Sequence, residues 1–300
     1  MIDPLAEFVT LLQPAATLSK VVGGAGQWRL RRTDVGQPFY CVVLHGACCL
    51  AAVGHEAITL AQGDFVLIPA AHDFTVSSVE PASPGEYAAP VVLAGGEVRL
   101  GVLDGPPDVL ILVGHCAFGS PDAALLVSLL PQLVHVRDEA RLGTLVGLVG
   151  DETHGSRPGR DLVLARLLEV LLIEALRSTT QTTASPGLLR GLADPRLAAA
   201  IRRMHEEPGH NWTVAELARE AALSRSTFFE RFRRAVGAAP MDYLLTWRMA
   251  LAQNLLRRRE GGIAEVAKSV GYGSASTFSV AFARHVGMPP GQYADRQAHA

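Results

Sequence analysis

The first half of the chain consists of short apolar runs separated by glycine- and proline-rich breaks. These runs fill most of residues 27–113, in the stretches "FYCVVLHGACCLAAV", "EAITLAQGDFVLIPA", "DFTVSSV", "EVRLGVL" and "PDVLILVG". Runs of this length between turn residues are typical of strands in a β-barrel or a β-sandwich. The pattern therefore predicts a mostly β domain over this part of the chain.

The pattern becomes helical after Ser120. Residues 120–131, 137–155 and 159–180 each have the length and apolar content of a helix. The third segment is apolar nearly all round, so more than one of its faces has to be covered. Two interpretations stay open for it: a helix buried in the domain core, or a core helix that also forms the seam of a dimer.

Residues 179–195 read "TTQTTASPGLLRGLADP", in which Thr, Ser, Pro and Gly cluster as they do in linkers. Beyond Asp194 the pattern is helical and broken only by short turns. We therefore predict an α+β protein of two domains. It has a β-barrel domain with following helices over 1–180, a linker over 181–194 and an all-helical domain over 195–300.

The helical half contains one pattern twice. Glu216 and Glu265 are 49 residues apart, so the second copy has one additional residue in its turn. Repeats this regular indicate one supersecondary unit used two times. Six positions recur at a spacing of 50: Phe228, Phe232, Val236, Gly237, Pro240 and Tyr243 return as Phe278, Phe282, Val286, Gly287, Pro290 and Tyr293.

Each copy has the signals of two short helices joined by a tight turn. In the first copy, Thr213 and Glu216 predict a capping box, and Ser224 is the expected N-cap of the second helix. Ser274 has the same place in the second copy. Two short helices of this kind, the second with a basic outer face, form a helix-turn-helix. Residues 240–259 between the copies predict one linking helix of about 30 Å, close to the roughly 34 Å between successive major-groove faces.

The faces opposite the buried stripes carry the candidate DNA contacts. Serine and threonine are permissive readers of base edges, Glu230 can accept from a cytosine amino group, and Val280 can touch a thymine methyl group. The arginines are better assigned to phosphates, which position the protein without specifying sequence. The expected contact residues are Arg225, Ser226, Thr227, Phe229, Glu230, Arg233, Arg234, Ser274, Ser276, Ser279, Val280 and Arg284.

Composition and charge agree with a two-part protein. The 300 residues are 49% hydrophobic and 19% charged, as in a globular chain. Residues 1–189 hold 11 Lys/Arg against 19 Asp/Glu, whereas residues 190–300 hold 16 against 10, which favours a polyanion-binding back half. The first twenty residues carry acids where a signal peptide needs bases, so we expect a cytoplasmic protein with no membrane partner.

The chain resembles the AraC/XylS family of bacterial transcription regulators. The resemblance is carried by "LSRSTFFERFRRAVGAAPMDYLLTWRMALAQNLLRR" and "IAEVAKSVGYGSASTFSVAFARHVGMPPGQY" in the back half. The front half resembles the cupin-like sensor domain of one branch of that family, through "PFYCVVLHGACCLAAVGHEAITLAQGDFVLIPAAHDFTVSS". The resemblance implies a homodimeric regulator that binds double-stranded promoter DNA, responds to a small-molecule effector and can contact RNA polymerase. Many members have Arg where this chain has Glu230 and Val280, which makes its operator sequence unpredictable by analogy.

The front half offers several kinds of sensor. Metal-binding cupins present an H-x-H pair with a later Glu and His, and this chain lacks the H-x-H pair. We therefore predict no metal and no cofactor. A cluster of Cys41, His45 and His72, joined by His115 or Cys116, is the alternative metal site.

The remaining interpretations of the barrel are an organic ligand, plain packing around a partly polar pocket, and thiol sensing. The candidate sensing residues are Cys41, His45, Cys48, His72 and Cys116. Thiol sensing requires an exposed cysteine with a lowered pKa. No Ser–His–Asp arrangement, phosphate loop or acid pair stands out, so we predict that the protein is not an enzyme. A metal-binding cupin sensor or enzyme fused to a DNA-binding domain is the alternative, and a non-specific architectural DNA binder is disfavoured by the acidic front half.

Overall fold

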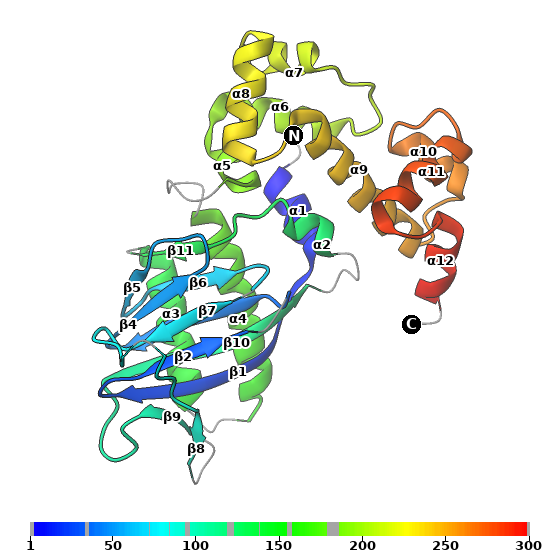
Figure 1. Ribbon diagram of the computed structural model, residues 1–300. Coiled ribbons are helices and arrows are strands. Elements are labelled where there is room, and N and C mark those ends of the chain that lie inside the picture. Colours follow the sequence, from blue (N-terminus) through cyan, green and yellow to red (C-terminus); the bar gives the residue numbers. More distant parts are fainter. Residues whose placement is uncertain are drawn as a thin grey trace. The chain divides into compact units, whose positions relative to one another are not determined.

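The chain folds into two compact units, one rich in strands and one helical (Figure 1). The first consists of Pro14–Ala117 and Gln132–Thr179, and the second of Met1–Gln13, Phe118–Pro131 and Thr180–Ala300. The predicted α+β class with two domains is confirmed. The computed structural model describes residues 3–33, 36–71, 73–83, 85–93, 97–118, 123–137, 139–154, 158–178 and 186–298.

Two sheets make up the β-rich unit. A seven-stranded sheet has the order β11-β6-β3-β10-β1-β9-β8, and a four-stranded sheet has the order β2-β7-β4-β5. β1 and β9 run parallel, whereas β3 pairs antiparallel with both β6 and β10. The strands are β1 (Pro14–Ala25), β2 (Arg29–Arg32), β3 (Phe39–His45), β4 (Ala47–Ala52), β5 (Ile58–Ala61), β6 (Phe65–Ile68), β7 (Phe74–Ser77), β8 (Val91–Val92), β9 (Val98–Gly101), β10 (Val109–Phe118) and β11 (Val134–Val136).

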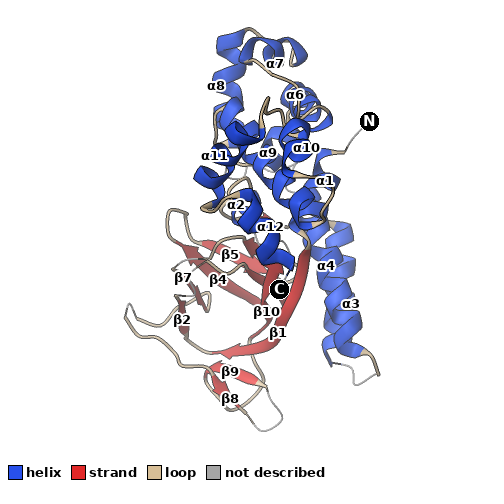
Figure 2. Cartoon of the chain, turned by 90° about the vertical axis from the view of Figure 1, so that its right-hand side faces the viewer, coloured by secondary structure: helices blue, strands red, loops and turns tan. Residues whose placement is uncertain are grey.

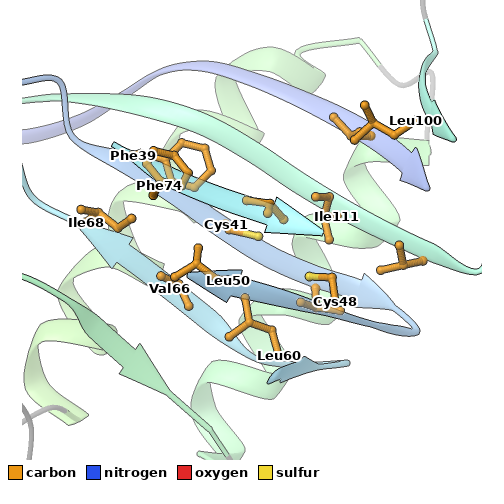
Figure 3. Close-up of a cluster of buried hydrophobic side chains, with 14 of the residues drawn as sticks. Phe39, Cys41, Cys48, Leu50, Leu60, Val66, Ile68, Phe74, Leu100 and Ile111 are labelled. Atoms are coloured by element: carbon orange, nitrogen blue, oxygen red, sulfur yellow. The ribbon is translucent and has the colours of Figure 1, made fainter. Parts of the chain in front are cut away.

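Side chains from both sheets meet in one apolar core (Figure 3). Phe39 and Cys41 enter it from β3, because alternate residues of a strand point to the same face. Tyr40 and Val42, on the opposite face of β3, are fully buried as well. Helices α3 (Ala140–His154) and α4 (Arg160–Ser178) pack against that opposite face (Figure 2). A sheet covered on both faces explains why this strand is an uninterrupted apolar run.

The helical unit repeats the same local design twice. Thr213 and Glu216 form the predicted capping box, and Ser224 and Ser274 cap the second helix of each copy. The further helices are α1 (Pro4–Leu12), α2 (Ala123–Val127), α5 (Leu188–Ala193), α6 (Pro195–Glu206), α7 (Val214–Glu220), α8 (Arg225–Val236), α9 (Pro240–Arg257), α10 (Ile263–Ser269), α11 (Ala275–Val286) and α12 (Pro290–Ala298).

Aromatic packing in the two copies is nearly superimposable. In the first copy the Phe228 and Phe232 ring centroids are 5.5 Å apart, and Phe232 meets Tyr243 edge-on at 5.6 Å. The second copy places Phe278 and Phe282 5.4 Å apart, with an edge-on tyrosine again 5.6 Å from the second ring. The repeated residues therefore build the same core packing in both copies. In each copy the second helix packs against the rest of its motif through the same face.

Several elements were not predicted from the sequence. The strand prediction began at Gln27 and so omitted β1, and the segments of α1, α5 and β11 were not assigned. In the described part of the helix expected over 120–131, α2 covers Ala123–Val127. α1 begins at a capping Asp3 whose carboxylate accepts from the backbone of Leu5 and Ala6. In the part of the chain that the structure describes, no helix has the length and hydropathy to cross a membrane.

Candidate nucleic-acid interface and barrel pocket

The outer faces of α8 and α11 hold most of the residues predicted to contact DNA. All twelve lie on these two helices or at the N-cap of α11, and all but Phe229 and Ser279 are exposed. Val280 is the extreme case, since 72% of this apolar side chain is open to solvent. An exposed apolar side chain at the centre of a helix face can contact a thymine methyl group.

Some of these polar side chains also serve their own helix. The Ser224 hydroxyl accepts from the Thr227 backbone amide at 3.2 Å, and Ser274 accepts from Thr277 in the same way at 3.1 Å. Ser279 donates its hydroxyl to the Ala275 carbonyl at 2.7 Å. Thr227, Ser274 and Ser279 therefore help to build the helices. The Ser226 hydroxyl also lies 3.3 Å from that of Ser224, and the Ser276 hydroxyl lies 3.0 Å from that of Ser274. Glu230 is exposed and is the polar residue most available to a base edge.

Four arginines give the two faces their positive charge. Arg225, Arg233, Arg234 and Arg284 are exposed, and none forms an ion pair with any other residue in the described ranges. Arg231 is different, because it is half-buried and bonds through Nε to the carboxylate of Asp194. That bond ties α8 to the N-cap of α6.

α11 borders a shallow hollow of about 600 Å³. Tyr272, Leu245 and His285 line it and were not among the predicted contacts. The signal for Tyr272 was present in the sequence, since it stands in the turn "GYG" directly before α11. The hollow is lined by Leu245, Tyr272, Ser276, Thr277, Val280, Ala281, Arg284 and His285.

A smaller pocket of about 160 Å³ opens into the barrel. Its walls are apolar apart from Lys20 on β1 and Arg32 on β2, and Arg32 Nη2 lies 3.2 Å from His115 Nε2. A volume near 150 Å³ is enough for a group the size of benzene. The lining residues are Lys20, Val22, Leu30, Arg32, Phe39, Val76, Pro90, Val92, Val98, Leu100, Ile111 and Val113.

Among the predicted sensing residues, Cys41, His45 and Cys48 do not line this pocket. Cys41 and Cys48 are fully buried in the apolar core (Figure 3), and His45 is exposed at the end of β3. His72 lies outside the described residues, as does the side chain of Cys116. Alternation along β1 and β2 could have indicated Lys20 and Arg32, because each shares a face with an apolar residue two positions away, Val22 and Leu30.

Burial makes Cys41 and Cys48 poor redox sensors. It raises the pKa of the Cys41 thiol well above its ordinary value, and it raises the pKa of Cys48 to about 12. The thiolate is the reactive form of cysteine, so burial disfavours oxidation of both groups in the folded unit. The structure therefore argues against the thiol-sensing interpretation at these two positions.

The cupin-like stretch around Asp64 serves structure. Asp64 is buried and accepts from Arg137 Nη2 at 2.6 Å, and it lies 3.2 Å from His135 Nε2. Burial alone would raise the pKa of this carboxyl, but the hydrogen bonds from His135 and Arg137 lower it to about 2. No group of three or more His, Cys, Asp or Glu side chains suited to a metal ion occurs among the residues described, and Asp64 instead fastens β11 to the sheet.

Family models match parts of both units. A family model described as "Cupin" matches residues 3–181, and one described as "Helix-turn-helix domain" matches residues 217–296. A protein named as an AraC-like transcription regulator in Streptomyces lividans is 37% identical over 300 residues, covering 97% of each chain. Its counterpart in Streptomyces antibioticus is 38% identical over 300 residues, covering 97% of this chain and 98% of that protein. The crystal structure of the DNA-binding domain of AdpA with a target DNA is 34% identical, covers 34% of this chain and 92% of its own, and has a TM-score of 0.33.

A cupin-like unit together with a duplicated helix-turn-helix defines a DNA-binding transcription regulator rather than an enzyme. The chain belongs to the family of AraC-like transcription regulators with a cupin N-terminal domain. The resemblance stated from the sequence is thereby confirmed.

Proposed function

We propose that α8 and α11 read two successive major-groove segments of promoter DNA. The observation that carries this proposal is the duplicated geometry, in which each capped second helix buries one face through the same aromatic contacts and exposes the other. α9 joins the two copies and, at 18 residues, is about 27 Å long. That length is near the roughly 34 Å between major-groove faces one turn apart.

Base reading is assigned to Ser226 and Glu230 on α8 and to Ser276 and Val280 on α11. Phosphate contacts are assigned to Arg225, Arg233, Arg234 and Arg284, whose guanidinium groups flank these residues on the exposed faces. The chain would then act where promoter DNA lies, in the cytoplasm. Contact with RNA polymerase stays a prediction of the family resemblance.

DNA selection tests this function. The full chain is used to select duplexes from a random library, and its affinity for the selected duplex is compared with that for unrelated DNA at about 0.15 M salt. We expect selected DNA to bind at least about a thousandfold more tightly than unrelated DNA, the usual margin for specific binding. Equal affinity for both would mean a non-specific architectural protein.

The barrel pocket is the proposed effector site. The pocket has a volume of about 160 Å³ and mostly apolar walls, which suit one aromatic ring or a short acyl group. Its two basic residues, Lys20 and Arg32, favour a carboxylate or another anion. The effector class is therefore a small aromatic or aliphatic acid. Binding such a ligand changes DNA affinity only if it favours one arrangement of the protein over another.

Titration with benzoate and hexanoate tests this class. We expect one of these acids to change the affinity of the wild-type chain for DNA. The Arg32→Ala variant should need at least about ten times more of the acid for the same change in DNA affinity. Val53→Ala, on an exposed turn and outside the pocket lining, is the matched control. An equal response in Arg32→Ala would show that the ligand binds elsewhere.

A second copy of the chain is the proposed partner of the α3–α4 hairpin. Both helices expose apolar side chains, with Leu148 at 47%, Leu162 at 64%, and Val163 and Val170 each at 45%. Val163 and Val170 are seven residues apart and so share one stripe of α4. A self-complementary face of this kind fits a two-fold dimer, in which both copies use the same patch.

A further inference from the structure

The turn between α6 and α7 is held by a side chain from α9. Arg248 donates from Nε to the Pro208 carbonyl and from Nη2 to the His210 carbonyl, each at 2.7 Å. A guanidinium is a rigid planar fork, so two bonds from it fix the orientation of the turn as well as its position. Arg248 is half-buried; its bond to Pro208 is partly buried, and its bond to His210 is exposed.

The same turn also contacts the second helix-turn-helix. A Cβ added to Gly209 would lie 3.0 Å from the Ser269 carbonyl oxygen at the end of α10. One added to Gly271 would lie 2.9 Å from the Gly209 carbonyl oxygen and 2.7 Å from Arg248 Nη2. Gly271 has φ +84°, a conformation that further favours glycine. The two turns therefore meet backbone to backbone, with Arg248 beside them.

Internal contacts keep the α6–α7 turn rigid. Trp212 donates its indole N–H to the Glu207 carbonyl at 3.0 Å, and the Arg203 guanidinium lies 5.7 Å from the centre of the Trp212 ring. The turn leads directly into α7, which packs against α8. A displacement of this turn would therefore displace the first recognition helix relative to the second.

We propose that Arg248 is a positioning residue that sets the separation and angle of α8 and α11, and with them the spacing of the two DNA segments that the protein accepts. The proposal rests on the proposed reading of DNA by both helices. With α9 as the sole connection, bending at its ends would let the two motifs adapt to several spacings. The contact through Arg248 and the two turns supplies a second connection, which removes that freedom.

Spacing variants of a bound duplex test this role. The probe is a duplex selected from a random library by the wild-type chain, with derivatives carrying one base pair inserted or deleted between the two protected segments. One base pair moves a segment by about 3.4 Å and rotates it by about 35°. We expect the wild-type protein to lose about tenfold or more in affinity on insertion, and Arg248→Ala to lose less than about threefold. Arg248→Lys, which cannot fork between two carbonyls, should be intermediate.

Arg258→Ala is the matched control at the end of the same helix, where the guanidinium bonds to Glu260 at 3.2 Å. It should keep the full insertion penalty even if its overall affinity changes. Gly209→Ala gives an independent variant should Arg248→Ala unfold, because the added methyl group pushes the two turns apart. Gly262→Ala, whose Cβ would meet open space, is its control.

The outcomes separate the two proposals. A wild-type insertion penalty that persists in both Arg248→Ala and Gly209→Ala overturns the role of Arg248 and leaves DNA reading by both helices intact. A wild-type protein that is indifferent to the insertion contradicts the reading of two linked segments, and the role of Arg248 with it.

Discussion

At the level of single residues, α8 and α11 share most of the residues that shape them and differ at one of the two positions proposed to read bases. Ser226 and Thr227 on α8 have identical counterparts on α11, and Arg234 corresponds to Arg284. Glu230, in contrast, corresponds to Val280. A carboxylate prefers the cytosine amino group, whereas a valine prefers a thymine methyl group. If both helices read DNA as proposed, the two DNA segments should differ in sequence.

Substituting one arginine and one glutamate on α8 should separate positioning from reading. Arg234→Ala should weaken binding to every DNA sequence and reduce the slope of log affinity against log salt by about 1, because one phosphate contact is lost. Glu230→Ala should leave that slope unchanged and relax base preference at one position of the operator. Binding measured over a salt series and on a panel of single-base operator variants distinguishes the two effects. An unchanged base preference in Glu230→Ala would refute its assignment.

At the scale of elements, α1 is the least expected part of the helical unit. It comes from the N-terminus of the chain, yet Glu7 lies 3.1 Å from Nδ1 of His205 on α6. The other ring nitrogen of His205 is 2.7 Å from the Tyr243 hydroxyl on α9, and its ring stacks on Trp247 at 3.7 Å. One buried imidazole therefore joins three helices that are far apart in the sequence.

This imidazole should make the helical unit sensitive to acid. Burial lowers the pKa of His205 below its ordinary value near 6.5, although Glu7 acts in the opposite direction. The unfolded chain therefore takes up a proton before the folded unit does, and stability should fall as the pH drops below about 6.5. The loss has a limiting slope of about 1.4 kcal/mol per pH unit.

Denaturant unfolding between pH 5 and pH 8, followed by tryptophan fluorescence, measures this loss. His205→Gln keeps a polar side chain at the site and should lower stability at pH 8 but flatten its pH dependence. His55→Gln is the control, because His55 lies in the β-rich unit and forms an exposed hydrogen bond with Gln132. This substitution should leave the pH dependence of stability unchanged. A wild-type slope that His205→Gln does not reduce would assign the acid sensitivity to other groups.

Elements defined by local signals could be predicted from the sequence, and those defined by distant partners could not. The capping box at Thr213 and the N-caps at Ser224 and Ser274 were read from neighbouring residues, and the structure reproduces them. The docking of α1 on α6 depends on His205, almost 200 residues away, although Asp3 and Pro4 already marked the helix start. The pocket was missed for the same reason, because only the assembled sheets decide that the interior is filled around Cys41 and open beside Lys20 and Arg32.

At the scale of the whole molecule, the division of the chain differs from a simple cut between front and back. α1 and α2 belong to the helical unit, yet they flank β1 and β10 along the chain. Both of these strands contribute to the barrel pocket, through Val22 on β1 and Ile111 on β10. The backbone therefore runs directly from the proposed effector site into helices that pack with the DNA-binding motifs. The predicted boundaries at 1–180, 181–194 and 195–300 stay a prediction for the functional domains.

Charging the exposed stripe of α4 should abolish the proposed dimer. Val163→Lys combined with Val170→Lys places like charges opposite each other across a two-fold face, so the chain should sediment as a monomer where the wild type sediments as a dimer. Val53→Lys changes a valine that is 75% exposed on a turn of the β-rich unit and should leave the dimer intact. Sedimentation velocity at several protein concentrations gives the result, and a dimer that survives the double substitution would place the interface elsewhere.

Hydroxyl-radical footprinting on a selected duplex tests whether one chain reads DNA with two linked helices. We predict two protected tracts centred about 10 base pairs apart on one face of the duplex. Replacing Ser276 and Val280 by alanine should weaken protection of one tract, and replacing Ser226 and Glu230 should weaken the other. A single protected tract, or two tracts that respond equally to changes in either helix, would contradict the reading of DNA by two linked helices.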